Sequence, residues 1–162
     1  WHEDNKALYD FENGNFFIEA KSTTALNRKH RFTISQAVVR PTRKVLLASF
    51  KLEEDELGLS LQEIYKRLSK IFHDDVERKE KLDFVIRSTL GKDWKAKSKI
   101  AYNYEKAIAE LAFFDLNEIP KVGKEYKEKP DLENISFTSV LDNLPQIKKL
   151  AFKKKSKFFK ER

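Results

Sequence analysis

The sequence predicts an α/β chain, an α+β arrangement in which helices flank a mixed sheet. Three observations carry this prediction. Strand-length apolar stretches lie in both halves of the chain, and two amphipathic helices follow one another between them. An Asn-Gly dipeptide between apolar residues adds a β-hairpin near the beginning. A chain of 162 residues is long enough to bury one hydrophobic core.

The hairpin is predicted over residues 5–11 and 16–23, with Asn13-Gly14 as its two loop residues. A type I′ turn needs positive φ at both central positions, which Asn and Gly tolerate best. In this register Asp10 is diagonal to Glu19, roughly 7–8 Å away between backbones, and a slip of one residue would separate them. One face carries Ala7, Tyr9, Phe11, Phe16, Ile18 and Ala20, an ordinary core set; the other carries Leu8, Asp10, Phe17, Glu19 and Lys21.

Two further strands are expected before the helices. Residues 31–34 suit a short strand, and residues 45–50 form a continuous apolar run that suits a central strand buried on both faces. Residues 53–58 are expected to form a turn.

The clearest helix runs from Ser60 to Phe72, because Ser60 and Glu63 form a capping box at its start. Its apolar stripe is more typical of a core than of a binding groove. A second helix, capped by Asp74 or Asp75, ends at Gly91. The next segment mixes aromatic residues with lysines, which either stack nucleic-acid bases or pack inward: Lys92, Trp94, Lys95, Lys97, Lys99, Tyr102 and Tyr104.

The last third is predicted to add two strands. Residues 107–116 favour a strand over a helix, because aromatic residues favour β structure, and residues 135–140 alternate as a late strand. Residues 121–133 read as a charged loop, and a helix is expected after residue 142. We assign residues 1–147 to one domain and residues 148–162 to a basic C-terminal tail.

The net charge of +7 lies entirely in that tail, because the preceding 147 residues balance acidic and basic groups. A second pattern is local: no acidic residue occurs between Lys21 and Lys51. Such a basic block suits phosphate binding, or it is a basic surface without a ligand. Its members are Lys21, Arg28, Lys29, Arg31, Arg40, Arg43, Lys44 and Lys51.

Other site chemistry is largely excluded by composition. The absence of cysteine excludes disulfides and thiolate zinc sites, and the histidines at positions 2, 30 and 73 show no ligand spacing. No apolar run reaches the length of a membrane span, and no secretory leader is visible. We therefore expect a cytoplasmic protein without a membrane partner.

The chemistry of the first hairpin is more specific. Two carboxylates that converge repel each other unless a divalent cation lies between them, and Mg²⁺ is typically held in this way. Such a metal activates water and stabilises charge on a phosphate, and a nearby lysine can orient that water. Asp10, Glu19 and Lys21 therefore suit phosphodiester cleavage. The alternative is a solvated strand face with a charge pair at positions i and i+2.

Three segments resemble the PD-(D/E)XK nuclease superfamily: Asp10-Phe11, Glu19-Ala20-Lys21-Ser22-Thr23 and Arg31 to Gln36. The similarity is greatest to PD-(D/E)XK motif proteins beside bacterial restriction and phage-defence genes. It implies a restriction-endonuclease-like core, metal ligation by Asp10, Glu19 and the Ala20 carbonyl, and catalysis with Lys21. Gln36 is a weaker parallel, near the substrate.

Two features depart from that superfamily. Tyr9 replaces the proline that often precedes the aspartate. Only nine residues precede Asp10, which is too few for the helix and strand that begin the superfamily core. We therefore expect a fragment that lacks its upstream helix.

The expected function is a metal-dependent endodeoxyribonuclease of a bacterial restriction or phage-defence system, using Mg²⁺ or Mn²⁺. Its partners would be DNA and either a second copy or other defence subunits. Two alternatives remain: an inactive or partner-dependent nucleic-acid-binding subunit, and an unrelated α/β protein with an accidental motif. The residues expected to bind substrate are Gln36, Arg28, Lys29, Arg31, Arg40, Arg43 and Lys44.

Overall fold

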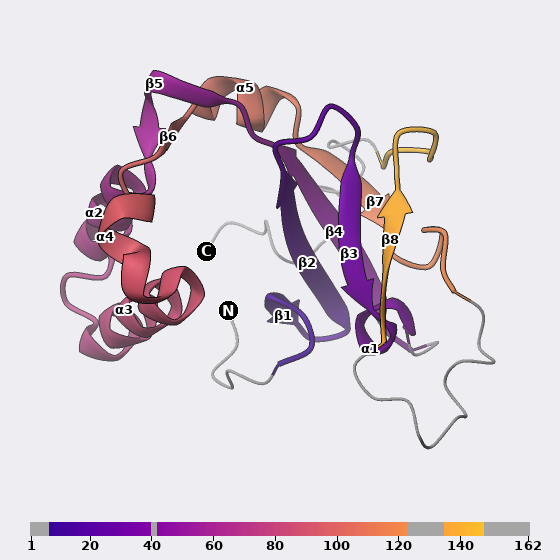
Figure 1. Cartoon of the computed structure of the whole chain (residues 1–162). Helices are drawn as coiled ribbons and strands as arrows, with labels where there is room; N and C mark the ends of the chain where they lie inside the picture. The colour runs from indigo at the N-terminus through magenta and orange to yellow at the C-terminus, as the bar shows by residue number, and fades with distance from the viewer. Residues whose placement is uncertain (1–6, 40–41, 123–134, 148–162) are drawn as a thin grey trace. The chain divides into compact units, whose positions relative to one another are not determined.

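The structure is a computed structural model that describes residues 7–39, 42–122 and 135–147. It has the predicted mixed α+β class, with a mixed sheet of parallel and antiparallel strands, consistent with a restriction-endonuclease-like fold (Figure 1). The chain forms two compact units. The first runs to Lys51 and resumes at Glu110, and the second spans Leu52–Ala109.

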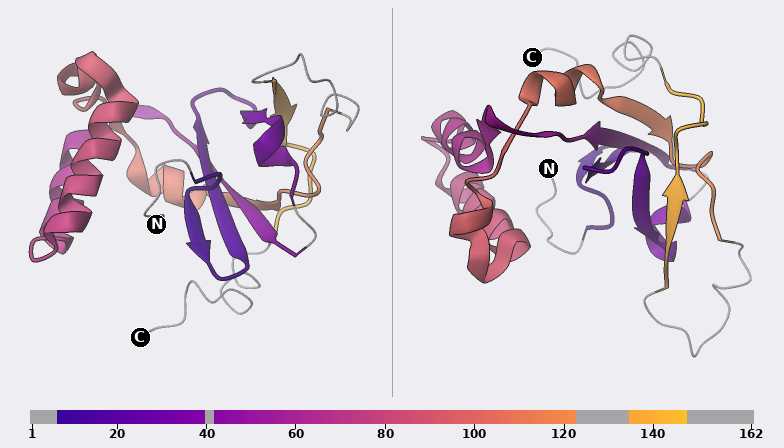
Figure 2. Two further views of the ribbon diagram at one scale, coloured as in Figure 1. Left: turned by 90° about the horizontal axis from the view of Figure 1, so that it is seen from below. Right: turned by 45° about the horizontal axis from the view of Figure 1, so that its top comes forward.

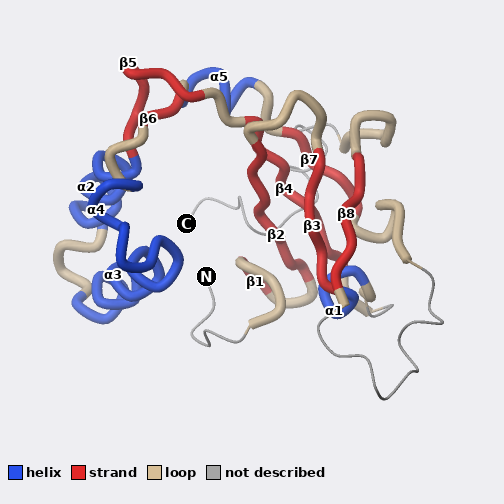
Figure 3. Tube along the Cα trace, in the orientation of Figure 1, coloured by secondary structure: helices blue, strands red, loops and turns tan. Residues whose placement is uncertain are grey.

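A four-stranded sheet is the centre of the first unit (Figure 3). Its order is β1 (Phe11–Asn13), β2 (Phe16–Thr23), β4 (Lys44–Lys51) and β7 (Ala112–Asp115). β2 and β4 are parallel, whereas β1 and β7 are antiparallel to their neighbours. The strand predicted at residues 45–50 is therefore confirmed in the interior of the sheet, and Leu47, Ala48 and Ser49 are buried there.

A second, two-stranded sheet pairs β3 (Lys29–Thr33) with β8 (Ser136–Val140) in antiparallel register (Figure 2). The alternation along β3 buries His30 and Phe32 and exposes the residues between them. One apolar cluster joins this sheet to one face of the larger sheet. It includes Tyr9, Phe17, Phe32, Val45, Leu47, Phe114, Leu116 and Leu141.

The hairpin register differs from the prediction. Asn13 pairs with Phe16 and Phe11 pairs with Ile18, so the loop is Gly14 and Asn15. Gly14 has a φ of 62°, which places the glycine at the first central position. The pairs are shifted by one residue on each strand, so residues that were expected to share a face still do. This register, continued beyond β1, places position 10 opposite Glu19 rather than diagonal to it.

The predicted core face of this hairpin was only partly right, since Tyr9 and Ile18 pack in apolar clusters but Phe11 does not. Phe17 is buried in the main cluster, on the face predicted to carry the charges, whereas Phe11 is 41% exposed. Tyr9 lies before β1, and its ring centroid is 5.5 Å from that of Phe17. Phe17 decides the outcome because its face of β2 meets the second sheet, and burial of aromatic area dominates core energetics.

The second unit contains two short strands and several helices. β5 and β6 form an antiparallel pair with an irregularity between Glu54 and Leu59. The elements are β5 (Glu54–Ser60), α2 (Leu61–Ile71), α3 (Val76–Leu90), the 3-10 turn η1 (Gly91–Asp93), α4 (Trp94–Lys97), β6 (Ala101–Tyr102) and α5 (Tyr104–Ala109).

Both predicted helices are confirmed with their caps. The Ser60 side chain accepts from the Glu63 amide, and the Glu63 carboxylate accepts from the Ser60 amide at 2.8 Å. Asp75 caps α3, and Gly91 ends it with a φ of 67°. The predicted burial of the α2 stripe is not observed, since no residue of α2 is buried.

Three predicted segments differ from the structure. Residues 53–58 contain most of β5 rather than a turn, and residues 107–116 contain the end of α5 followed by β7. Residues 142–147 are not helical, and Ile147 instead bridges Phe113. Most of the predicted loop at 121–133 and the basic tail at 148–162 lie outside the described residues, so the boundary after residue 147 stays a prediction. None of the described helices is long and apolar enough to span a membrane.

Candidate active site

The predicted site residues Asp10, Glu19 and Lys21 all lie at β2: Glu19 and Lys21 on the strand, and Asp10 bonded to its backbone. Glu19 and Lys21 lie two residues apart on the strand and therefore share a face. The chain bends at residues 8–10, and the Asp10 Oδ2 atom accepts a hydrogen bond of 2.7 Å from the Ala20 amide. The hairpin thus brings the first carboxylate to the strand that carries the second.

Glu19 is a buried carboxylate with two donors on one oxygen. Its side chain is 5% exposed, and its Oε1 accepts from Lys21 Nζ at 2.8 Å and from Gln36 Nε2 at 2.8 Å. Burial raises the pKa of Glu19, Lys21 and Gln36 oppose that rise, and the nearby Asp10 charge adds to it. The Asp10 charge thus lies near enough to Glu19 to contribute to this rise in its pKa.

Gln36 reaches Glu19 because a single helical turn holds it in place. This turn, α1 (Ile34–Ala37), begins with a capping box in which Thr33 accepts from the Gln36 amide. The Gln36 Oε1 atom in turn accepts from the Thr33 amide at 3.2 Å, so one side chain both caps the helix and donates to Glu19. Gln36 thus lies beside Glu19, and its position near a substrate stays a prediction.

Tyr9 is a site neighbour that the sequence argument did not identify. Its hydroxyl donates to the Gln36 carbonyl at 3.2 Å. Burial raises its pKa, a nearby Arg43 lowers it, and Glu19 raises it. The sequence feature that could have indicated this role is the position of Tyr9 beside Asp10, where the superfamily often has a proline. Proline lacks the hydroxyl that makes this contact.

Lys21 lies between Glu19 and the second sheet. Its ammonium nitrogen is 5.1 Å from the centroid of the Phe32 ring, and its side chain is 18% exposed. Nearby, the buried His30 places Nε2 at 2.8 Å from Ser49 Oγ. Burial, Lys21 and Arg28 lower the pKa of His30 to about 4, so this histidine is neutral at pH 7. It is therefore a buried polar contact, which its isolation in the sequence did not indicate.

Arg28 corrects the predicted substrate-binding set. Its guanidinium is buried and donates through Nη1 to the Ser49 carbonyl and hydroxyl, each at 2.9 Å, and through Nη2 to the Glu110 carbonyl. Its backbone amide donates to the Asp142 carboxylate at 3.1 Å. Through these contacts Arg28 connects strands and loops of the first unit, so we remove it from the predicted substrate-binding residues.

The other basic residues are spread over different surfaces. Lys29 and Arg31 are exposed on the face of β3 opposite His30 and Phe32, and the Arg31 Nε atom donates to the Ser136 hydroxyl at 2.7 Å. The Arg43 guanidinium lies 4.8 Å from the ring centroid of Phe17, on the side of the site. Lys44 instead lies over Phe16, and Arg40 is outside the described residues.

The donor set suits a hard divalent cation. Asp10 and Glu19 supply carboxylate oxygens, which Mg²⁺ prefers, and Mg²⁺ needs only one or two carboxylates beside water and phosphate oxygens. Within the described residues no group of three or more His, Cys, Asp or Glu side chains could hold a metal. A cation held by Asp10 and Glu19 would take its remaining ligands from water or substrate. Ligation by the Ala20 carbonyl stays a prediction.

Comparison with known proteins gives one match. A family model described as "Putative PD-(D/E)XK family member, (DUF4420)" matches residues 1–142. No curated protein and no solved structure matches the chain. The matched residues include Asp10, Glu19, Lys21 and Gln36, together with all but the end of the described chain.

Proposed function

The chain belongs to this DUF4420 family of the PD-(D/E)XK group, and from that premise we propose that it is a divalent-metal-dependent nuclease that hydrolyses DNA phosphodiester bonds. One observation carries the proposal. Asp10 is bonded to the backbone of the strand on which Glu19 and Lys21 are paired, and its charge raises the pKa of Glu19, which supports a site with two carboxylates and an ammonium group.

In the proposed chemistry, Asp10 and Glu19 hold Mg²⁺ or Mn²⁺, with the Ala20 carbonyl as a further ligand. When bound, the ion supplies Lewis-acid activation of water and stabilisation of phosphate charge. Lys21, beside Glu19, is placed to orient a water molecule or to donate to a phosphate oxygen. Gln36 holds the Glu19 carboxylate in position from α1, and Tyr9 holds Gln36.

The proposed substrate contacts follow the positions of the basic residues. Arg43 lies on the same side of β2 and β4 as the site and is the first candidate for a phosphate near it. Lys29, Arg31 and Lys44 are exposed, and they suit phosphates farther along the DNA. The proposed setting is bacterial restriction or phage defence in the cytoplasm, with a second copy or another defence subunit as protein partner.

Plasmid cleavage tests the proposal. The full chain is incubated with supercoiled DNA, with and without Mg²⁺ or Mn²⁺, beside Lys21→Met and the matched exposed substitution Lys70→Met. We expect metal-dependent nicking that falls about 100-fold or more in Lys21→Met, because proton transfer and charge stabilisation are lost. Lys70→Met should cleave like the parent. Equal cleavage by all three would refute the assignment.

A second function has one observation in its favour. The Glu19 Oε1 atom already accepts from Lys21 and Gln36, so one oxygen of this carboxylate is engaged by donors of the chain itself. That arrangement suits a nucleic-acid-binding subunit that is inactive or needs a partner. Calorimetric titration with Mn²⁺ separates the two functions. Binding that disappears in Asp10→Asn supports the nuclease, and no binding by the parent supports the inactive subunit.

A further inference from the structure

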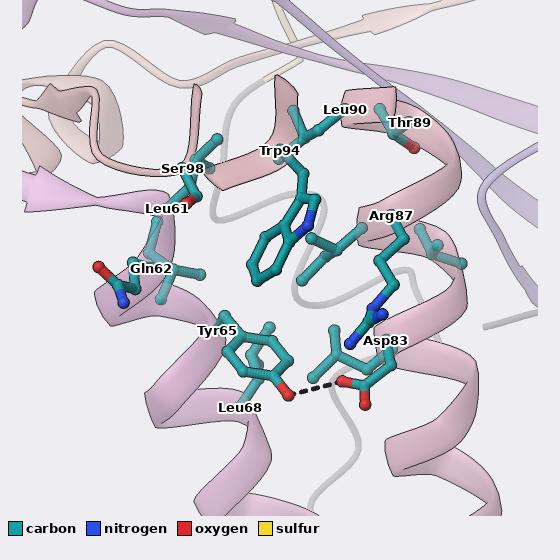
Figure 4. A pocket seen from close by; sticks show the side chains of 14 residues that line it. Leu61, Gln62, Tyr65, Leu68, Asp83, Arg87, Thr89, Leu90, Trp94 and Ser98 are labelled. Atoms are coloured by element: carbon teal, nitrogen blue, oxygen red, sulfur yellow. Dashed lines mark hydrogen bonds between the residues drawn. The ribbon is translucent and has the colours of Figure 1, made fainter. Parts of the chain in front are cut away.

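The second unit contains an apolar cavity that the proposed cleavage chemistry does not use. It lies between α2 and α3 and has a volume of about 310 Å³, and Trp94 of α4 projects into it (Figure 4). Its walls are mainly aliphatic, formed by Leu61, Ile64, Leu68, Leu82, Val85 and Ile86. Among the described residues, both clusters of buried apolar side chains belong to the first unit. An occupant of this cavity would therefore cover apolar surface that the second unit leaves accessible.

The size and shape of the cavity limit the occupant. Small-molecule sites usually measure roughly 300–1,000 Å³, so this cavity suits one or two fused rings rather than a protein helix. Tyr65 and Trp94 both project into the space between the helices (Figure 4). Two aromatic faces among aliphatic walls favour a planar, aromatic ligand, because rings pack in offset-stacked or edge-to-face geometry.

The few polar groups of the cavity favour a ring with hydrogen-bonding edges. Tyr65 donates to the Asp83 Oδ1 atom at 2.6 Å, and this bond raises the pKa of Tyr65. The Asp83 Oδ2 atom can accept from a ligand amino group. The Arg87 guanidinium, 5.5 Å from the Trp94 ring centroid, can donate to a ring nitrogen or carbonyl.

The positive charge of the segment beside the cavity favours a ligand that also carries negative charge. Trp94 and Ser98 line it, and they belong to a segment, residues 87–99, that contains five basic residues and one acidic residue. Lys92, Lys95 and Lys99 are exposed in this segment. A ligand that joins an aromatic ring to phosphate would satisfy both the cavity and these cations, whereas a neutral apolar ligand would use only the cavity.

We propose that this cavity holds one unstacked base of the DNA strand on which the nuclease acts, with adjacent phosphates on the exposed lysines of residues 87–99. The choice of DNA as the source of the base rests on the proposed function. The second unit would then contribute substrate recognition, and the first unit would carry the cleavage site.

The test uses the natural reporter in the cavity. The chain has two tryptophans, so Trp1→Phe leaves Trp94 as the sole tryptophan. The full chain with this substitution is titrated in EDTA with a single-stranded DNA of about 12 nucleotides, within the usual range of site sizes. An abasic strand of equal length controls for phosphate binding. A mononucleotide controls for binding of a free ligand.

We expect the normal strand to quench Trp94 fluorescence and to bind about 10-fold or more tightly than the abasic strand, because base stacking on aromatic side chains supplies that difference. Val85→Phe, which fills the cavity, should remove the preference for the normal strand. Arg87→Gln, an exposed change that spares the fold, should weaken it. Arg78→Gln, on the same helix but outside the cavity, is the matched control.

Several outcomes would overturn the inference. These are equal binding of the normal and abasic strands, an unchanged preference in both Val85→Phe and Arg87→Gln, and quenching by the mononucleotide as strong as by the strand. A Trp94 emission maximum that shifts as the protein concentration is raised, without DNA, would assign the cavity to a second copy of the chain. Binding in EDTA is independent of cleavage. Quenching by the normal strand without any nuclease activity would refute the proposed function and support the base site. Nuclease activity without such quenching would support the proposed function and overturn the base site.

Discussion

The buried polar side chains Arg28, His30 and Ser49 of the first unit have hydrogen-bond partners within the fold. Arg28, His30 and Ser49 form one group in which the Ser49 hydroxyl contacts both of the others at 2.8–2.9 Å. Arg28 also donates to the Glu110 carbonyl, which connects the group to the chain leading into β7. A buried donor or acceptor that loses its partner costs more than the bond itself contributes, so each member is sensitive to substitution.

The substitution Arg28→Leu should destabilise the fold by about 3 kcal/mol, because it leaves buried carbonyls without a donor. The neighbouring Lys29→Leu, at an exposed position, should change stability by less than about 0.5 kcal/mol. Urea denaturation followed by circular dichroism measures both. A stable Arg28→Leu variant that had lost only DNA affinity would return Arg28 to the substrate-binding set.

His30 should make stability depend on pH. Its pKa is 6.5 in the unfolded chain and about 4 in the folded chain, so the unfolded state binds more protons between these values. Stability therefore falls as the pH falls from about 6.5 to about 4, by about 3 kcal/mol at most. Denaturation midpoints across this range measure the effect.

The substitution His30→Gln should flatten that pH profile, because glutamine can contact Ser49 but does not titrate there. His73→Gln, at a side chain that is 72% exposed, is the matched exposed substitution. A parent profile that matched His30→Gln would show that His30 is not the group responsible.

The secondary-structure elements end where their caps and glycines require. Thr33 and Ser60 begin helices with reciprocal capping boxes, and Gly91 ends α3 at a positive φ. Gly58 has another role, because a Cβ atom at this position would clash with the backbone carbonyl of Tyr102. The pairing of β5 with β6 thus depends on the absence of a side chain there.

Two glycine substitutions in the second unit separate these roles. Gly58→Ala should cost about 2 kcal/mol or more, because Tyr102 backbone atoms cannot move as a side chain would. Gly91→Ala meets no atom within 4 Å, but the φ of 67° and ψ of −153° at this position form a combination that essentially only glycine adopts, so backbone strain alone should cost about 1–3 kcal/mol. Thermal denaturation followed at Trp94 in the Trp1→Phe background measures both. A Gly58→Ala variant as stable as the parent would refute the proposed clash.

Elements with strong local signals are predicted from the sequence. Ser60, Glu63 and Gly91 determine helix ends through local hydrogen bonds and φ alone, and these predictions are confirmed. The strand β5 was missed because an acidic stretch with Gly58 has the composition of a turn, and only its partner Tyr102 makes it a strand.

The candidate site was predictable where it depends on strand alternation. Glu19 and Lys21 share a face in any register, so their proximity follows from the sequence. The contacts of Tyr9 and Gln36 depend on α1, which meets β2 only in the tertiary fold, and the contact of His30 likewise brings β3 to Ser49 of β4. Arg28 was misplaced for the same reason, since a count of basic residues carries no information on burial.

At the scale of the whole molecule, the second unit is an insertion between two neighbouring strands. The chain leaves the first unit after β4 and returns before β7, and Ser49 of β4 pairs directly with Ala112 of β7. Directly paired residues of antiparallel strands lie about 4.5–5.5 Å apart between Cα atoms. The sheet of the first unit therefore does not need the inserted residues to keep its register.

Replacement of residues 52–109 by a short Gly/Ser linker should leave the first unit folded, because its strands and both apolar clusters lie outside the insertion. The shortened chain should retain cooperative denaturation by circular dichroism. It should also lose the preference for normal over abasic single strands. A shortened chain without cooperative denaturation would show that the first unit depends on the second.

The contact between Asp10 and the Ala20 amide has a consequence for solubility. β1 pairs with β2 only up to Ile18, so the outer edge of β2 beyond that point has no strand beside it among the described residues. Such an edge is a template for another chain, and a charged group placed on it opposes that association. Asp10 takes the Ala20 amide that an incoming strand would use. The same carboxylate thus opposes edge-to-edge aggregation of the folded chain, and Asp10→Ala would expose this edge of β2.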